Sequence, residues 1–530
     1  MIRPFIYWIV ICCGFISCSQ KEATPQRPNI LFIMTDDHTQ KAIHAYGQGL
    51  LDSVYFPNMN RLAKEGALFR NSFVTNSICA PSRAVLLTGK YSHLNGKIDN
   101  VGPFDWDQPT YPKLLQQGGY QTALIGKIHL DGKPQGYDYS LTLPGQGNYY
   151  NPEFIKNGEE ELKFEGHCEA LIPEFVVDWL EKDWDRSKPF AINYHTKAPH
   201  RNWMPEEKYL DLFEDKEFDF PSNFFDNYQG RGQAAKDQEM EIVNDMYWGW
   251  DMKFDNNPFT GEASPLAAPF GRMSQEQLAA WNKVYGPVNE KFLNNNLPKD
   301  KSIKELPSGE NLAKFMYHRY LRDYLKVVKS VDDGIGKVMD YLEKEGLLDN
   351  TIIIYTSDQG FYLGEHGWYD KRFMYEQSLS TPLLVRYPKE IKAGTEVKEM
   401  VLNLDHAPTI LDFAGIEIPQ DMQGSSWRPI AAGQSVPWRD AIYYHYYEYP
   451  GPHNVKRHYG VRTDRYKLIH FYHDIDEWEL YDLQKDPEEM NSVYDDPEYI
   501  KVKEMLMVKL RELRLQYGDS DELTQQFINN

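Results

Sequence analysis

Short runs of apolar, often β-branched residues recur along the chain and indicate buried strands. Near-continuous apolar runs, without polar alternation, are typical of a parallel sheet that is covered on both faces. They lie between stretches with helical periodicity. The five clearest runs are 29–35, 121–125, 189–194, 351–356 and 382–387.

Three helical patterns between these runs have clear ends. Residues 57–64 begin with a proline and stop before a glycine, and residues 113–117 stop at a pair of glycines. A longer pattern, from about 311 to 345, leads into the run at 351. Alternating strands and helices predict an α/β fold, with a large mixed or mostly parallel sheet sandwiched by helices.

Two regions depart from this alternation. Residues 206–307 are rich in Asn, Asp, Trp and Gly and show few clear strands, so we expect an insertion in a catalytic domain that spans 28–436. Residues 437–530 predict a smaller C-terminal α+β subdomain with a short antiparallel sheet. Its expected elements are strands at 442–447, 458–463, 466–471 and 478–482 and a helix at 499–516.

The N-terminus has the plan of an export signal. A basic residue and an apolar run too short to span a bilayer comfortably precede Phe-Ile-Ser-Cys18, which looks like a lipoprotein cleavage site. We expect residues 1–18 to be the signal, Cys18 to be lipidated, and residues 19–27 to form a tether. The protein would then lie in the periplasm or on an outer-membrane lipid anchor. Ordinary signal cleavage, or cleavage at Cys12 or Cys13, is the alternative.

Composition narrows the possible partners. The chain has 530 residues, 41% of them hydrophobic, which is enough for a large core, and a formal net charge of -21. This charge argues against a nucleic-acid partner. It also means that an anionic substrate has to be held by a local cluster of Arg, Lys and His. Only Cys79 and Cys168 lie in the mature body, where a disulfide between them is conceivable.

Residues suited to chemistry follow four of the five predicted strands. In open α/β sheets, ligands bind beyond the carboxyl ends of the strands, so these residues are expected on one face. They are Asp36 and Asp37, then Lys127 and His129, then His195, Lys197 and His200, and finally Asp358 and Gln359.

The two pairs at 36–37 and 358–359 offer only oxygen ligands. Hard cations such as calcium favour this set, whereas zinc favours His or Cys. Asp after a strand often only starts a turn or caps a helix. Two such pairs, each after a buried strand, favour a metal site formed by Asp36, Asp37, Asp358 and Gln359.

Cys79 begins the segment Cys79-Ala-Pro-Ser-Arg83, which is followed by Ala-Val-Leu-Leu-Thr-Gly89. Proline suits the first turn of a helix and glycine its end, so Cys79 is expected at a helix N-terminus that favours an anion. Arg83 can reach the same anion. A thiol in that place could also be a low-pKa nucleophile, but no cysteine-protease signature is present.

At these residues the chain resembles the type I sulfatases of the alkaline-phosphatase-like superfamily, and the resemblance spans residue 28 to the C-terminus. Within the family, a maturation enzyme reads Cys-x-Pro-Ser-Arg and oxidises the cysteine to formylglycine. One departure is Gln359, where Asn is usual; Gln offers the same carbonyl on a longer arm. Further shared segments are 29–37, 126–129, 198–200, 357–360, 364–367, 371–376 and 480–487.

The resemblance implies a mechanism. Hydrated formylglycine at Cys79 would attack sulfur, the alcohol would leave, and the covalent sulfate would then be expelled. His129 would be the base of the second step, and His200 with Lys371 would protonate or steady the leaving oxygen. Arg83 and Lys127 would hold sulfate oxygens and the nucleophile. Asp36, Asp37, Asp358 and Gln359 would hold one calcium ion.

Several of these residues also have ordinary structural interpretations. Lys371 fits a solvated surface lysine, and His195 fits a core histidine bonded to backbone, which we favour over catalysis. His366 lies in a glycine-flanked loop and fits a structural role. Cys168 fits a buried or free thiol.

The segment 198–205, together with Asp358-Gln359, resembles bacterial sulfatases that act on sulfated amino sugars. This implies exo-acting removal of 6-O-sulfate from N-acetylglucosamine of heparan-type or mucin glycans. Another sulfated sugar or position, phosphonate or phosphodiester hydrolysis, and a non-catalytic glycan-binding lipoprotein remain alternatives. The expected sugar contacts are Arg201, Asn202 and Trp203, and His453, Arg457 and His458 with Lys456 beside them.

Overall fold

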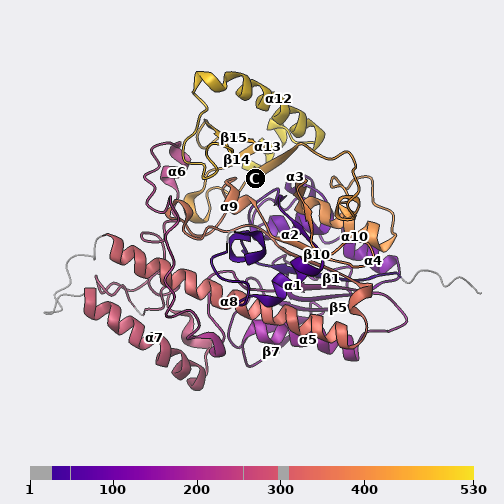
Figure 1. Ribbon diagram of the computed structural model, residues 1–530, viewed down its shortest axis with the longest axis horizontal. Coiled ribbons are helices and arrows are strands. Elements are labelled where there is room, and N and C mark those ends of the chain that lie inside the picture. The colour runs from indigo at the N-terminus through magenta and orange to yellow at the C-terminus, as the bar shows by residue number, and fades with distance from the viewer. Residues whose placement is uncertain (1–26, 48, 255, 297–308, 530) are drawn as a thin grey trace, which may run out of the picture.

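The computed structural model describes residues 27–47, 49–254, 256–296 and 309–529. The predicted signal, Cys18 and all but the last residue of the tether lie outside the described residues. In Figure 1, the C-terminal elements α12 and α13 lie at the top, above a central α/β body. Among the described helices, none is both long enough and apolar enough to cross a bilayer.

A single mixed sheet forms the centre of the body. Its four middle strands, β9, β1, β8 and β4, are neighbours and run parallel. The strand ends predicted to carry chemistry therefore meet at one edge. In spatial order the strands are β11 (Thr395–Val397), β2 (Ala67–Phe69), β10 (Leu383–Arg386), β9 (Thr351–Ser357), β1 (Asn29–Thr35), β8 (Phe190–His195), β4 (Gln121–Lys127), β5 (Tyr139–Leu143), β6 (Glu153–Lys156) and β7 (Glu160–Lys163).

Both faces of this sheet are buried. Along β1, Leu31 and Ile33 point into one apolar cluster, and Ile30 and Phe32 point into another on the opposite face. This explains why β1 reads as a continuous apolar run and not as an alternating one. The α/β sandwich predicted from the pattern is confirmed.

Helices form the two outer layers. Helices α1, α5 and α8 contact one another and cover one face, and α2, α4 and α10 cover the other. The helices of the body are α1 (Pro57–Glu65), α2 (Cys79–Thr88), α3 (Ser92–Asn95), α4 (Tyr111–Gln117), α5 (Cys168–Lys182), α6 (Gln233–Asp237), α7 (Gln275–Asn296), α8 (Glu310–Lys344), α9 (Glu376–Leu379), α10 (His406–Ala414) and α11 (Arg428–Ala431).

Two features differ from the sequence expectation. Strand β10 is antiparallel to β9, although its apolar run was grouped with the parallel strands. Strand β10 lies inside the sheet, between β2 and β9, and a buried strand is apolar whichever way it runs, so the apolar pattern cannot reveal its direction. The second feature is α7, a long helix in the predicted insertion. Its Phe292 ring stacks on Phe315 of α8, and its Trp281 and Tyr285 rings stack on each other.

The C-terminal segment forms its own antiparallel sheet, as the short amphipathic runs predicted. Helix α12 (Ile500–Gln516) packs on this sheet, and α13 (Asp521–Asn529) follows it. The exact boundary at 437 stays a prediction. The strands are β13 (Ala441–Tyr446), β14 (His458–Thr463), β15 (Tyr466–Phe471) and β16 (Glu477–Asp482), in that order.

Candidate active site

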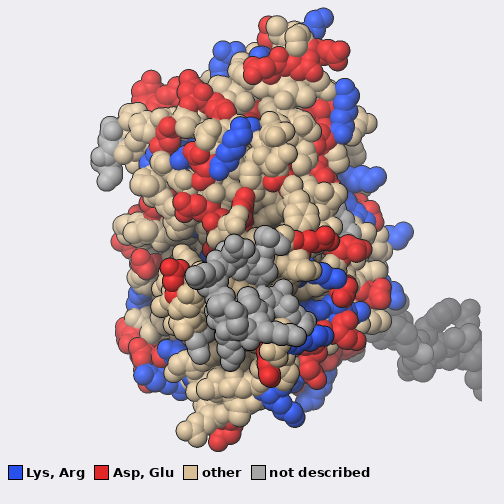
Figure 2. All heavy atoms as spheres, turned by 90° about the vertical axis from the view of Figure 1, so that its left-hand side faces the viewer, with Lys and Arg blue, Asp and Glu red and all other residues tan. Residues whose placement is uncertain are grey.

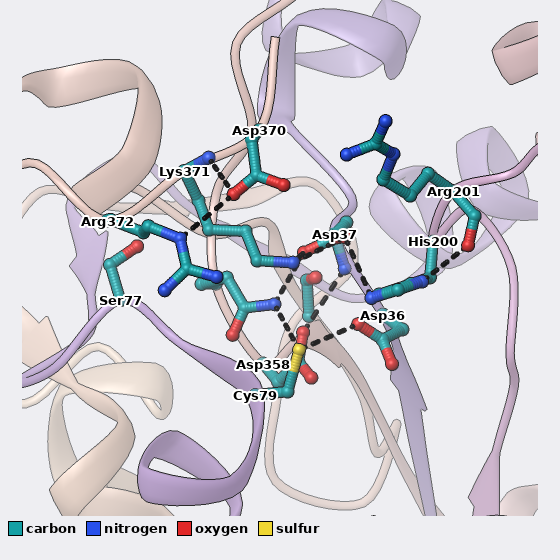
Figure 3. A network of polar contacts seen from close by, with 12 residues as sticks. Asp36, Asp37, Ser77, Cys79, His200, Arg201, Asp358, Asp370, Lys371 and Arg372 are labelled. Atoms are coloured by element: carbon teal, nitrogen blue, oxygen red, sulfur yellow. Dashed lines mark hydrogen bonds and ion pairs between the residues drawn. The ribbon is translucent and has the colours of Figure 1, made fainter. Parts of the chain in front are cut away.

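Three carboxylates meet beyond the ends of β1 and β9. Asp36 and Asp37 follow β1, Asp358 follows β9, and all three are fully buried. Oxygen atoms of the three lie within 4.8 Å of one another, and the backbone N–H of Asp37 donates to Asp358 Oδ1 at 3.2 Å. Figure 3 shows them converging with Cys79 and Lys371. The two pairs predicted from separate strand ends therefore form one cluster.

The cluster contains charges that a cation would relieve. Burial, with repulsion from Asp36, raises the pKa of Asp358 to about 6. Burial, with repulsion from both neighbouring carboxylates, raises the pKa of Asp37 to about 7. Gln359 Oε1 is buried without a hydrogen-bond partner among the described residues. An all-oxygen set with an orphaned carbonyl fits a hard cation such as calcium.

The amide of Gln359 lies beside both the carboxylates and the thiol. Its Nε2 donates to Asp37 Oδ1 at 2.6 Å and lies 3.5 Å from Cys79 Sγ. A 180° flip of this amide would place Oε1, in place of Nε2, next to the same groups. The orientation of a Gln amide is assigned from its hydrogen-bond contacts, so a bound cation would favour the flipped orientation. The longer arm of Gln thus reaches the cluster.

Cys79 is the first residue of α2, as the helix signals predicted, and it is buried. Its Sγ lies 3.4 Å from Asp36 Oδ1. Burial, together with the negative charge of Asp36, raises the pKa of this thiol far above its usual range. An unmodified Cys79 is therefore a protonated thiol, which argues against a thiolate nucleophile. Both Cys79 and Cys168 are free, so the disulfide alternative is wrong for this structure.

Two cations bind the carboxylates from the β4 side. Arg83 donates to Asp358 Oδ2 through Nε at 2.8 Å, lies 3.2 Å from Asp36, and also donates to the Lys127 carbonyl at 2.7 Å. Lys127 pairs with Asp36. Burial raises the pKa of Asp36, but Lys127, with His200 and Arg83, lowers it well below its usual range.

Lys371 binds the remaining carboxylate, Asp37. Its Nζ lies 2.7 Å from Asp37, and the side chain is buried, so a solvated surface role does not fit it. Burial lowers its pKa, but Asp37 more than compensates and holds it well above its usual value. It is a permanent cation beside the cluster.

Two histidines also lie close to the carboxylate cluster. Burial, with the Lys127 charge, lowers the pKa of His129 to about 2, so its ring is neutral; its Nδ1 is buried without a partner among the described residues. His200 Nε2 lies 3.9 Å from Asp37 Oδ2, and its Nδ1 lies 2.6 Å from the Arg201 carbonyl. Burial lowers the pKa of His200 well below its usual value.

The sequence reasoning missed two supporting residues. Gln146, in the loop after β5, accepts a hydrogen bond from Lys127 and donates to His129 Nε2 at 3.2 Å. Glu169, in the first turn of α5, accepts from the backbone N–H groups of Lys197 and Ala198 at 3.0 and 2.8 Å. Glu169 therefore fixes the loop that carries His200. Neither follows one of the five strands predicted from the sequence, so the apolar pattern gave no signal for them.

A third missed residue is Asp370, beside Lys371. His453 of the C-terminal subdomain lies 3.3 Å from it, and Arg372 lies 3.4 Å from it while also contacting Glu448. Figure 3 shows Asp370, Lys371 and Arg372 on the same side of the cluster. The only sequence signal was adjacency to Lys371.

The residues expected to contact sugar fall into two groups. Arg201, Asn202 and His453 line cavities next to the cluster. Trp203 is fully buried against Tyr320, and its indole donates to the Pro199 carbonyl at 2.7 Å. We therefore withdraw Trp203 from the sugar contacts.

Two C-terminal residues also lie away from these cavities. His458 is fully buried, with one ring nitrogen 3.1 Å from the Met374 N–H and the other 2.8 Å from the Lys456 carbonyl. Arg457 lies 2.7 Å from Asp474 and donates to the Tyr447 carbonyl at 3.0 Å, within its own subdomain. Both are withdrawn as sugar contacts, since internal partners already satisfy them.

The two histidines with structural interpretations behave as expected. His195 is fully buried, and its Nδ1 lies 3.1 Å from the Lys127 carbonyl, as a core histidine bonded to backbone would. His366 is buried beside Asp226 and Asn223, away from the carboxylate cluster.

The fold and this buried cluster define a class of enzyme: hydrolases of sulfuric esters with an alkaline-phosphatase-like fold. The chain belongs to the sulfatase family, whose model matches residues 28–416. A second model, N-sulphoglucosamine sulphohydrolase, C-terminal, matches residues 364–516. The family predicted from the Cys79 segment is therefore confirmed.

Individual relatives extend this result. An N-acetylglucosamine-6-O-sulfatase of Bacteroides thetaiotaomicron is 47% identical over 95% of this chain and 89% of its own length. Human N-acetylglucosamine-6-sulfatase is 26% identical over 83% of this chain and 70% of its own length. A solved structure of a protein in complex with its substrate D-glucosamine-2-N,6-O-disulfate superposes with a TM-score of 0.87 and 46% identity. The match covers 94% of this chain and 99% of that one.

Proposed function

We propose that this enzyme removes the 6-O-sulfate from an N-substituted glucosamine at the non-reducing end of a glycan. The observation that carries the proposal is the convergence of Cys79, the carboxylate cluster and three buried cations at one sheet edge. Two relatives support the choice of sugar and position. The relative that is 47% identical is named an N-acetylglucosamine-6-O-sulfatase, and the solved structure that is 46% identical holds D-glucosamine-2-N,6-O-disulfate as its substrate.

We propose that Cys79 is oxidised to formylglycine by a maturation enzyme and that its hydrate supplies the nucleophilic oxygen. The protonated state of the buried thiol supports this, because the unmodified side chain would be a poor nucleophile. A calcium ion held by Asp36, Asp37, Asp358 and Gln359 would supply Lewis-acid polarisation of sulfate and nucleophile. The side chains around the carboxylate cluster carry out the remaining tasks of binding the anion and moving protons.

The cations hold and neutralise the anion. Arg83 and Lys127 pair with Asp36, and Lys371 pairs with Asp37, so a sulfate bound at the cluster meets the positive charge of all three. Lys371 stabilises the negative charge that grows on the leaving oxygen. His200 is placed to give that oxygen a proton, because the charge of a bound sulfate raises the pKa of a neighbouring imidazole.

His129 takes up the proton in the second half of the reaction. Burial keeps its ring neutral, so a lone pair is available, and Gln146 holds the ring in place. His129 would take the proton that the remaining hydroxyl of the nucleophile loses as sulfate departs, and a hydrated aldehyde at Cys79 would supply both of these oxygens.

We also propose that the enzyme is exported as a lipoprotein through Cys18, and that it meets its saccharide outside the cytoplasm. The signal-like N-terminus supports this. Metabolic labelling with a lipid precursor, compared between wild type and Cys18→Ser, tests it: label on wild type alone is expected. Label on neither would leave an ordinary cleaved signal.

The test of function is sulfate release from N-acetylglucosamine-6-sulfate in the presence of calcium. Mass spectrometry of the Cys79 peptide first verifies the aldehyde. We expect release by wild type and by Cys168→Ala, a matched change at the other buried free thiol, and none by Cys79→Ala. Failure of matured wild type on this sugar, with turnover of another sulfated sugar or a phosphonate ester, would refute the substrate assignment.

A further inference from the structure

Two cavities open beside the active site, and Arg201 lines both. The first, which we call the Trp250 cavity, has a volume of about 650 Å³ and is lined by the 144–150 loop and the His200 loop. The insertion contributes Trp250, Leu266, Pro269, Gly271 and Arg272 to its wall. The second, the Tyr369 cavity, measures about 720 Å³ and lies against residues 451–453 of the C-terminal subdomain. Each is large enough for a sugar-sized ligand.

The Trp250 cavity is continuous with the catalytic residues. His200 forms part of its wall, and so does Gln146, which contacts both Lys127 and His129. A sugar bonded to the one that reacts would therefore enter this cavity without crossing the protein.

The two cavities differ in charge. The described lining of the Trp250 cavity includes Lys197, His200, Arg201 and Arg272 and contains no carboxylate. The Tyr369 cavity is lined by Glu239, Asp245 and Glu262 together with Arg201 and His453. On the face of the molecule that Figure 2 shows, acidic and basic side chains are interspersed among other residues, so the difference in charge is local to the two cavities. An anionic glycan is therefore favoured in the first cavity and opposed in the second.

Lys197 is the cation that lacks a counter-ion. Its side chain is buried, and its Nζ contacts the Gln146 carbonyl at 3.3 Å and lies 4.7 Å from the centre of the Tyr149 ring. Within the described residues no carboxylate lies within ion-pair distance of it, whereas Arg201 pairs with Asp251 and Arg272 with Glu153. A buried ammonium without an anion is costly, so an anion from the ligand would be stabilising here.

Trp250 supplies an unused flat surface. Its indole is partly exposed, lines the cavity, and makes no hydrogen bond or ring contact with any described residue. The next residue, Asp251, accepts from the Tyr247 N–H at 2.8 Å and binds Arg201, so the turn that carries the indole is fixed. A fixed, unpaired indole suits the apolar face of a sugar ring, with an N–H donor at its edge.

We propose that the Trp250 cavity binds the second sugar of the glycan and that this sugar is a hexuronate. Trp250 stacks on its ring, and Lys197 pairs with its carboxylate. The inference rests on the proposed function and deepens it: the second sugar is bonded to C1 of the sulfated glucosamine. The Trp250 cavity therefore selects glycans of the heparan type, in which the second sugar is a uronate, over mucin glycans, in which it is neutral.

The test uses three substrates with matured enzyme and calcium: N-acetylglucosamine-6-sulfate alone, its disaccharide with glucuronate, and the same disaccharide with glucose in place of glucuronate. We expect kcat/KM to be at least tenfold higher for the glucuronate disaccharide than for the other two. Lys197→Met should remove the difference between the two disaccharides. Trp250→Ala should bring both disaccharides close to the monosaccharide.

Each variant is normalised to its own monosaccharide turnover, which also shows that it is folded. Phe225→Ala removes an exposed aromatic ring that lines neither cavity, and it should keep the wild-type ratios. Equal kcat/KM for all three substrates, or a preference for the glucose disaccharide, would overturn the inference. No turnover of any of them by wild type with verified formylglycine would instead refute the proposed function.

Discussion

Glu169 provides a sensitive probe of how the active-site loop is held, because it is a carboxylate buried behind that loop. Burial raises its pKa to about 7, against the lowering effect of the two backbone N–H groups that it accepts. Because the folded pKa lies above the unfolded value, this group stabilises the fold at low pH, and the stabilisation is lost as pH rises through about 7.

The size of the effect follows from the shift. With pKa values of about 7 folded and about 4.5 unfolded, raising the pH from 5 to 8 costs wild type about 2.5 kcal/mol through this group alone. Glu169→Gln keeps the shape and an acceptor oxygen but cannot ionise. The free energy of unfolding of Glu169→Gln, relative to that of wild type, should therefore be about 2.5 kcal/mol higher at pH 8 than at pH 5.

The assay is thermal unfolding of both proteins at pH 5 and pH 8. For a chain of this length, about 2.5 kcal/mol corresponds to a relative shift of roughly 2–3 °C in Tm. Glu169→Ala is the contrasting variant: it leaves two buried N–H groups unpaired, which costs roughly 2–6 kcal/mol, and it frees the His200 loop, so kcat should fall as well. A Glu169→Gln protein that tracks wild type at both pH values would refute this account of Glu169.

Further predictions concern the cluster itself. Gln359→Asn shortens the arm that reaches Asp37, so calcium affinity measured by titration calorimetry should fall about tenfold or more; unchanged affinity would remove Gln359 from the metal ligands. Calcium chelation should abolish turnover, and added calcium should restore it. His129→Ala should lower kcat roughly 100- to 10,000-fold with little change in KM. Lys371→Met should lower kcat more for sugars than for aryl sulfates, whose leaving groups need less stabilisation; equal losses would argue against its action on the leaving oxygen.

The carboxylate cluster and the position of Cys79 could be predicted from the sequence because each residue lies next to a strong local signal. Asp36 and Asp358 directly follow fully buried strands, and Cys79 lies two residues before a proline in the first turn of a helix. Such signals are local, and the parallel arrangement of neighbouring strands then brings their ends together. The parallel pairing of β1 with β9 therefore accounts for the position at which the carboxylates meet.

The supporting residues were missed for a corresponding reason. Gln146 contacts residues 17 and 19 positions away, and Glu169 contacts residues 28 and 29 positions away. Those contacts exist only once the loops are folded. His458 was misjudged in the same way, since a histidine in a cationic stretch reads as exposed, yet it lies in β14 facing the core. Side-chain direction in a short strand depends on register, which no residue in the stretch specifies.

Charge balance explains how so acidic a protein binds an anion. Asp36, Asp37 and Asp358 are matched by Arg83, Lys127 and Lys371, so the cluster taken alone has no excess charge to attract sulfate. A divalent cation among the carboxylates would compete with these three side chains for the same oxygens and give the site the positive charge that it lacks. The buried cations would then be free to face a sulfate instead of their carboxylate partners. On this argument, calcium and substrate bind cooperatively, and the formal net charge of -21 sets no limit on affinity.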